Sequence, residues 1–107
     1  MGVEGLPKEF VASRWTRGNH IFPTRISVNR ERVLRIKPRM FGNTEESIAI
    51  AKVASVRINN GLFFSDICIE STGGTDPIAS HGHRKHDATE IRSLIEQLQE
   101  QETHSNA

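Results

Sequence analysis

The last segment of the chain, residues 86–101, is the feature that most constrains the fold. Its apolar residues recur at spacings of three and four, which is the period of an α-helix with one buried face: Ala88, Ile91, Leu94, Ile95 and Leu98. Asp87 is the predicted N-cap, and Glu90 follows three positions on, as in a capping box. One helix of this length is marginal in water, and two heptads are too few to indicate a coiled coil. We therefore expect residues 87–101 to pack on the rest of the domain.

The segments before this helix have the two-residue period of half-buried β-strands. Six strands are predicted, over residues 24–29, 32–40, 47–51, 53–59, 62–71 and 76–81. Asn60 and Gly61 predict a type I′ hairpin, because that turn needs a positive φ at both central residues. The first twenty residues fit either a short helix opened by Pro7 or a strand over residues 10–15, with Trp15 in the core or as a lid.

The pattern predicts an α+β fold that is mostly β: an antiparallel bent sheet or barrel of about six to seven strands, capped by the C-terminal helix. We expect one domain over residues 20–102, with an N-terminal extension at 1–19 and a disordered tail at 103–107. The single cysteine, Cys68, excludes an internal disulfide framework and is typical of a reducing compartment. With neither a long apolar run nor a signal peptide, the predicted location is cytoplasmic, with peripheral membrane attachment as an extension.

The order of these segments resembles the bacterial pleckstrin-homology-like (PH-like) domain family. Four stretches carry the resemblance: ISVNRERVLRI at 26–36, SIAIAKVASVRINNG at 47–61, DICIESTGG at 66–74 and ATEIRSLIEQL at 88–98. The resemblance implies a bent antiparallel sheet closed at one end by the helix. It also implies a binding or assembly module, because family members are generally of that kind. Eukaryotic relatives bind phosphoinositide head groups through a basic pattern on the first strands, and Lys37-Pro38-Arg39 is similar to that pattern.

Basic residues are concentrated early in the chain. Eight Lys and Arg lie between Arg14 and Arg39 against one acid, Glu31, whereas ten acids and five bases follow from Phe41 onward. If Leu34, Ile36 and Met40 point inward, then four cations share the outer face of the sheet and form a candidate site for anionic lipid: Arg25, Arg35, Lys37 and Arg39. The alternative is a solvated strand face paired with nearby glutamates. Nucleic acid is not an expected partner, because only Phe41 lies near as a stacking platform.

Other polar residues give weaker indications of chemistry. His81, His83 and His86 are spaced closely enough to hold a metal ion, but Arg84 and Lys85 between them oppose it, so we predict neither a metal nor a cofactor. A pH-sensitive loop is an alternative for this segment, because histidines titrate near neutrality. Cys68 is predicted as a half-buried structural residue, and no catalytic constellation is found.

Phe63 and Phe64 are adjacent in a predicted strand, so only one of the two can face the core and the other is a candidate interface residue. We therefore predict a non-enzymatic module that acts by protein–protein or self-association, with a homo-oligomer favoured over a monomer. The alternative function is peripheral binding of anionic lipid head groups through the basic strand face.

Overall fold

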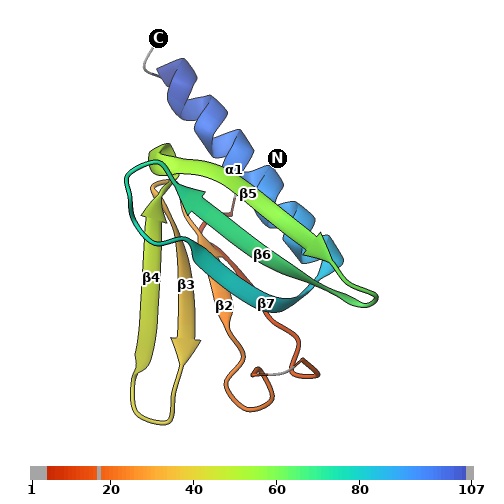
Figure 1. Ribbon diagram of the computed structural model, residues 1–107. Coiled ribbons are helices and arrows are strands. Elements are labelled where there is room, and N and C mark those ends of the chain that lie inside the picture. The colour runs from red at the N-terminus through yellow and green to blue at the C-terminus, as the bar shows by residue number, and fades with distance from the viewer. Residues whose placement is uncertain (1–4, 17, 106–107) are drawn as a thin grey trace.

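Two antiparallel sheets and one helix make up the computed structural model of the protein, which describes residues 5–16 and 18–105 (Figure 1). The first sheet has the strand order β1-β2-β3-β4, with β1 at Lys8–Val11, β2 at Arg25–Val28, β3 at Arg32–Pro38 and β4 at Asn43–Ala49. The second sheet has the order β5-β6-β7, with β5 at Val53–Asn60, β6 at Phe64–Ser71 and β7 at Ile78–Arg84. The two sheets remain separate ladders, so the predicted bent antiparallel arrangement is confirmed in its open form.

A short 3₁₀ turn, η1 at Ile50–Lys52, carries the chain from the first sheet to the second. The Ile50 N–H donates to the Glu31 carbonyl at 2.8 Å, and the Ile50 side chain is fully buried. In Figure 1, the strands of the second sheet cross those of the first. This crossing leaves an open corner between the sheets that only another element can cover.

Helix α1, Lys85–Ser105, covers that corner and runs beside β5 (Figure 1). Its five predicted core residues, Ala88 to Leu98, are each at most 3% exposed, so the prediction of the buried helix face is confirmed. They pack in one cluster with residues of both sheets, among them Ile26, Val33, Ile67 and Ile69. No helix in the described part of the chain has the length and apolarity that a bilayer crossing requires.

The start of α1 differs from the prediction. The helix begins at Lys85, immediately after β7, so Asp87 lies inside the first turn and is not the N-cap. Its carboxylate still lies near the positive end of the helix dipole. Glu90, the predicted partner in a capping box, instead forms an ion pair with Lys8 on β1. The helix is thereby tied to the edge strand of the first sheet.

Strand boundaries differ from the prediction where the sequence alternation is weak. β4 begins at Asn43 and not at residue 47, because its polar first half pairs with the end of β3 beyond the core. Neither Asn60 nor Gly61 has a positive φ, so the predicted type I′ turn is wrong. β5 continues to Asn60 and β6 starts at Phe64, which leaves Leu62 at the apex of a longer hairpin loop.

The N-terminal segment contributes a strand, and the alternative of a short helix is wrong. β1 pairs with β2 in the register Phe10↔Ile26, and Phe10 is buried in the core. Trp15 follows in the β1–β2 loop and is 88% exposed, so its predicted place in the core is wrong. Residues 1–4 of the predicted extension lie outside the described residues, as do residues 106 and 107 of the predicted tail, while α1 continues to Ser105.

If α1 completes the core, then truncating its buried face must destabilise the whole domain. We expect Leu94→Ala to lower the free energy of unfolding by about 2–4 kcal/mol, because the cavity adds to the lost burial. The matched control is Glu96→Ala, at an exposed position of the same helix, which should change stability by less than about 0.5 kcal/mol. Urea unfolding followed by circular dichroism measures both values. Equal stability of the two variants would contradict the role given to α1.

Candidate functional site

The cations of the predicted basic face do not all lie on one side of the first sheet. In the β2–β3 ladder, Arg25 is opposite Ile36, while Arg35 is opposite the core residue Ile26. Directly paired residues point to the same side of a sheet, so Arg25 and Arg35 point to opposite sides. Val33, not Leu34, is the fully buried residue of β3, and the predicted facing of this strand is therefore wrong.

Arg25 and Arg35 each have a carboxylate close to them. Arg25 Nη1 lies 3.7 Å from Glu9 Oε1 on the outer face, and Arg35 Nη1 lies 3.0 Å from Glu46 Oε1 on the inner face. These pairs neutralise the two charges locally, as the alternative of a solvated and paired face predicted. They do not include Lys37, which also lies on the inner face of β3 and contacts carbonyl groups.

Lys37 serves a different purpose, because its ammonium group holds the β1–β2 loop. Lys37 Nζ donates to the carbonyl oxygens of Phe22, at 2.8 Å, and Gly18. Partial burial lowers the pKa of Lys37, and the neighbouring charges of Arg35 and Arg39 lower it further. Arg39 lies just beyond β3 and is exposed at the β3–β4 hairpin.

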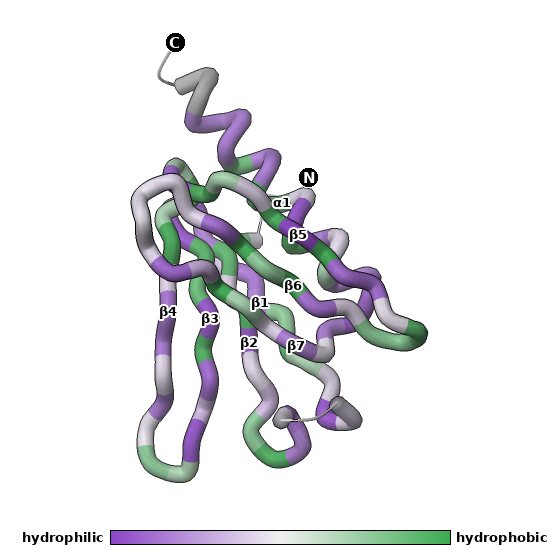
Figure 2. Tube along the Cα trace, viewed as in Figure 1, coloured by the Kyte–Doolittle hydropathy of each residue, from purple (hydrophilic) through white to green (hydrophobic). Residues whose placement is uncertain are grey.

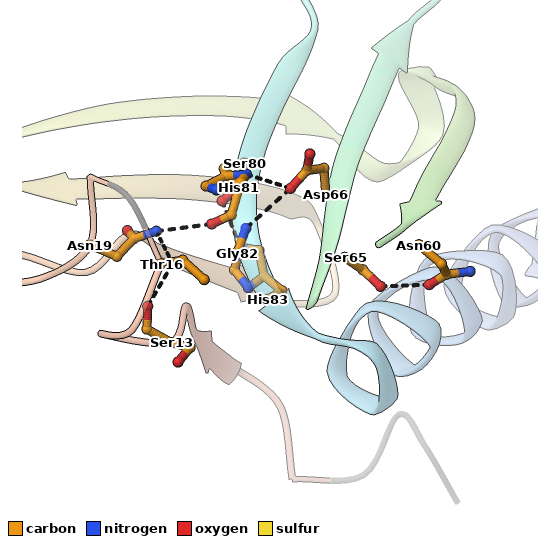
Figure 3. Close-up of polar contacts among 10 residues, drawn as sticks. All are labelled: Ser13, Thr16, Asn19, Asn60, Ser65, Asp66, Ser80, His81, Gly82 and His83. Carbon is orange, nitrogen blue, oxygen red and sulfur yellow. Dashed lines mark hydrogen bonds and ion pairs between the residues drawn. The ribbon is translucent and has the colours of Figure 1, made fainter. Parts of the chain in front are cut away.

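A cleft of about 450 Å³ lies between the inner face of β3, the β1–β2 loop and strands β5 to β7. Arg35 and Lys37 line it on one side, and Asp66 and His81 on the other. His81 Nδ1 lies 2.6 Å from Asp66 Oδ1, which joins β7 to β6 across the cleft wall (Figure 3). The cleft therefore carries two cations, one carboxylate and one histidine, and none of the ion pairs among the described residues involves Lys37.

A buried polar network fixes the β1–β2 loop against β7 (Figure 3). Asn19 Nδ2 donates to Thr16 Oγ1 at 2.9 Å and to the His81 carbonyl at 3.0 Å, while Asn19 Oδ1 accepts from the Thr24 N–H at 2.8 Å. The Ser13 N–H donates to the Gly82 carbonyl at 2.9 Å. The sequence prediction does not include this network, although the short polar side chains of Ser13, Thr16 and Asn19 in one loop are a signal for it.

A β-bulge at His81 and Gly82 separates the three candidate metal ligands. Ser65 pairs with His83 and Ile67 with Ser80, so two residues of β7 stand opposite the single Asp66. The extra residue turns His83 into the core, while His81 stays exposed on the other face and His86 is exposed on α1. Among the described residues, no group of three His, Cys, Asp or Glu could hold a metal ion.

His83 is a buried, uncharged member of the core. Its Nε2 lies 2.6 Å from Ser80 Oγ, and its Nδ1 has no hydrogen-bond partner among the described residues. Burial lowers the pKa of His83 to about 4; the Asp66 carboxylate opposes this shift and His81 adds to it. A serine–histidine pair acts as nucleophile and base only when a third group orients the imidazole. Within the described part of the chain, His83 Nδ1 has no partner that fills that role, and the prediction that this segment titrates near neutrality is wrong for His83.

The structure also gives the positions of three further residues of the prediction, Phe63, Phe64 and Cys68. Phe63 is 74% exposed at the β5–β6 apex, whereas Phe64 is half-buried at the start of β6, opposite Arg84. Cys68 is half-buried on the outer face of β6, as predicted, with Arg57 Nη2 at 4.0 Å from its Sγ. The apex at Phe63 also includes Leu62, which is 82% exposed and which the sequence analysis had placed in a strand.

Because Gly82 lies against Thr16 of the β1–β2 loop, we expect one methyl group added at Gly82 to have a large effect on stability. Gly82 has a φ of 85°, and a Cβ on it would lie 2.1 Å from Thr16 Oγ1. We expect Gly82→Ala to destabilise the protein by about 3 kcal/mol or more, from backbone strain and overpacking together. Gly74→Ala is the matched control: its φ is 79° with nothing within 4 Å, so only the strain of about 1 kcal/mol applies. Thermal unfolding that showed equal losses would contradict the docked loop.

The buried neutral imidazole predicts a loss of stability in acid. The pKa of His83 is about 4 in the folded protein, against an ordinary value of 6.5. Below pH 6.5 the unfolded chain therefore binds a proton that the folded protein does not, and stability falls until the pH reaches about 4, by about 3 kcal/mol in all. Urea midpoints at a series of pH values should show this slope in the wild type and lose it in His83→Leu. His86→Gln, at an exposed histidine, is the control that should keep the slope.

Comparisons with known proteins do not place the chain in a family. No protein-family model matches it, and no curated protein or solved structure matches it either. The resemblance to PH-like domains therefore stays a prediction.

Proposed function

We propose that the chain is a non-enzymatic binding and assembly module of the PH-like type that associates with a second copy of itself. The observation that carries the proposal is the apex of the β5–β6 hairpin, where Leu62 and Phe63 are 82% and 74% exposed. Adjacent exposed apolar side chains of this size are typical of interfaces, whereas single ones are scattered on most surfaces. Because Cys68 is unpaired, we also propose a reducing, cytoplasmic location.

The strand beside the apex provides the rest of the interface. β5 lies at the edge of the second sheet, so one row of its backbone groups faces outward. Gln99 of α1 donates to the carbonyls of Ile50 and Val53 and thereby covers the start of this edge. Towards the apex, Asn59 and Asn60 are exposed.

Antiparallel pairing of β5 with β5 of a second copy pairs the outward-facing backbone groups of both edge strands. It also relates the two copies by a twofold axis. Such pairing is isologous, because each copy contributes the same edge to the contact. Each apex then extends past its own sheet towards the first half of the partner's strand, where Ala54 is exposed. In this arrangement the backbone hydrogen bonds between the two β5 strands fix their antiparallel orientation, and the two apices supply most of the apolar surface that becomes buried.

The alternative of lipid binding through the basic strand face receives less support from the geometry. Arg25 and Arg35 point to opposite sides of the sheet, and each is paired with a glutamate. Lys37 is held by carbonyl groups of the β1–β2 loop, which leaves Arg39 as the exposed member of the set. The strand face therefore does not present the four cations together to an anionic surface.

Removing the apolar apex tests the proposed association. We expect light scattering after size exclusion to show a concentration-dependent dimer for the wild type and a monomer for Leu62→Ser/Phe63→Ser, since fully burying each of these side chains contributes about 1.5–3 kcal/mol. Met40→Ser/Phe41→Ser, at the exposed β3–β4 hairpin, is the matched control and should remain a dimer. A wild type that stays monomeric at high concentration would refute the proposal.

A further inference from the structure

A second cluster of exposed apolar side chains lies where the β1–β2 and β3–β4 loops meet, at the end of the molecule away from the C-terminus (Figure 1). We name residues 18–22 and 38–42 the loop tip. Lys37 joins its two halves through the Gly18 and Phe22 carbonyls. The halves also share a cavity of about 510 Å³, whose apolar lining is Ile21, Phe22, Pro38 and Met40.

The outermost residues of the loop tip are apolar. Met40 and Phe41 are 75% and 89% exposed at the β3–β4 apex, and Ile21 is exposed on the neighbouring loop. Figure 2 shows both loop ends as hydrophobic stretches, in contrast to the polar strand segments that lead to them. Trp15, also exposed, lies on the same loop as Ile21. Ile21 and Met40 also line the cavity between the two loops, whereas Phe41 and Trp15 are not part of its lining.

The charge of the loop tip is positive and is not neutralised by carboxylates. Residues 10–30 contain no Asp or Glu, and neither do residues 32–44. Arg14 Nη1 donates to the Ile21 carbonyl at 3.1 Å, and Lys37 likewise donates to carbonyls. In the part of the chain that the structure describes, none of the ion pairs involves Arg14, Lys37 or Arg39. A carbonyl satisfies the hydrogen-bonding capacity of a cation without cancelling its charge, so the positive potential remains at the tip.

We infer that the loop tip docks on the surface of an anionic lipid bilayer, with Ile21, Met40 and Phe41 inserted at the level of the head groups. Aromatic and other apolar side chains at a membrane–water interface exchange water contact for lipid contact, while Lys and Arg beside them are attracted to anionic lipid. An anionic bilayer has a negatively charged surface and an apolar interior, so it fits exposed apolar loop ends that lie beside unneutralised cations. This surface is separate from the β5 edge, so the inference goes beyond the proposed self-association and does not depend on it.

Flotation with phospholipid vesicles tests the inference. The wild type should bind vesicles of phosphatidylcholine with phosphatidylserine, bind pure phosphatidylcholine more weakly, and dissociate as salt is raised. Ile21→Ser/Met40→Ser/Phe41→Ser should reduce binding by at least about tenfold, because its three side chains no longer enter the interface. Arg39→Glu should reduce it by about fivefold for each unit of charge removed. Far-ultraviolet circular dichroism confirms that each variant is folded, as expected for exposed positions.

Leu62→Ser/Phe63→Ser is the matched control, because it removes an equally exposed apolar pair from the β5–β6 apex. It should keep wild-type vesicle binding even where it dissociates the dimer, so the two proposals fail separately. Absence of wild-type binding at low salt would refute the inference, as would equal binding to neutral vesicles or full binding by the triple variant. Tight binding of soluble inositol hexakisphosphate that Arg39→Glu abolishes and the triple variant keeps would also refute it, in favour of an anion site. Binding to an acidic peptide with no vesicle binding would overturn it in favour of a protein partner.

Discussion

The packing of one helix face on two crossed sheets is the interaction on which this fold depends. Neither sheet covers its own apolar side, and the open corner between them exposes Ile67 and Ile69 unless α1 lies across it. Leu94 and Ile95 close that corner, and the Lys8–Glu90 ion pair ties the helix to the far edge of the first sheet. Since a helix of this length is unstable alone in water, helix and sheets stabilise each other and form together.

The lower half of the molecule is organised by polar contacts, because the apolar core does not extend to it. Beyond Val33, the inner face of β3 carries Arg35 and Lys37, and the β1–β2 loop lies against these residues and against β7. Buried hydrogen bonds of Asn19 and a close approach to Gly82 hold that loop in one position. Buried polar networks of this kind fix a single geometry when their members are satisfied. The loop tip is therefore supported by a defined structure, although it has no regular secondary structure of its own.

The helix and the strands could be predicted from the sequence, but the side of β3, the most charged strand, that faces the core could not. The helical face from Ala88 to Leu98 was predictable because five residues repeat one period, and an error of one position would break the pattern. β3 reads Arg-Val-Leu-Arg-Ile-Lys, in which either Val33 or the pair Leu34 and Ile36 could face the core. The register between β2 and β3 decides which side of β3 faces the core, because it places Arg35 opposite Ile26. This register depends on the pairing of two strands and cannot be read from the sequence of β3 alone. The bulge that separates His81 from His83 is likewise set by pairing between strands, so the local sequence could not predict it.

The exposed apolar residues at the two ends of the molecule are not explained by the stability of the folded chain. Leu62 and Phe63 at one end, and Met40 and Phe41 at the other, lie on apices outside the core cluster, so no packing within the chain offsets their contact with water. The proposed contacts with a second copy and with a bilayer would supply the gain that balances this cost. The two apices differ in their surroundings, because Asn59 and Asn60 flank the first, whereas cations flank the second. A neutral apex beside an open strand edge suits a second copy of the protein, and a cationic one suits an anionic surface.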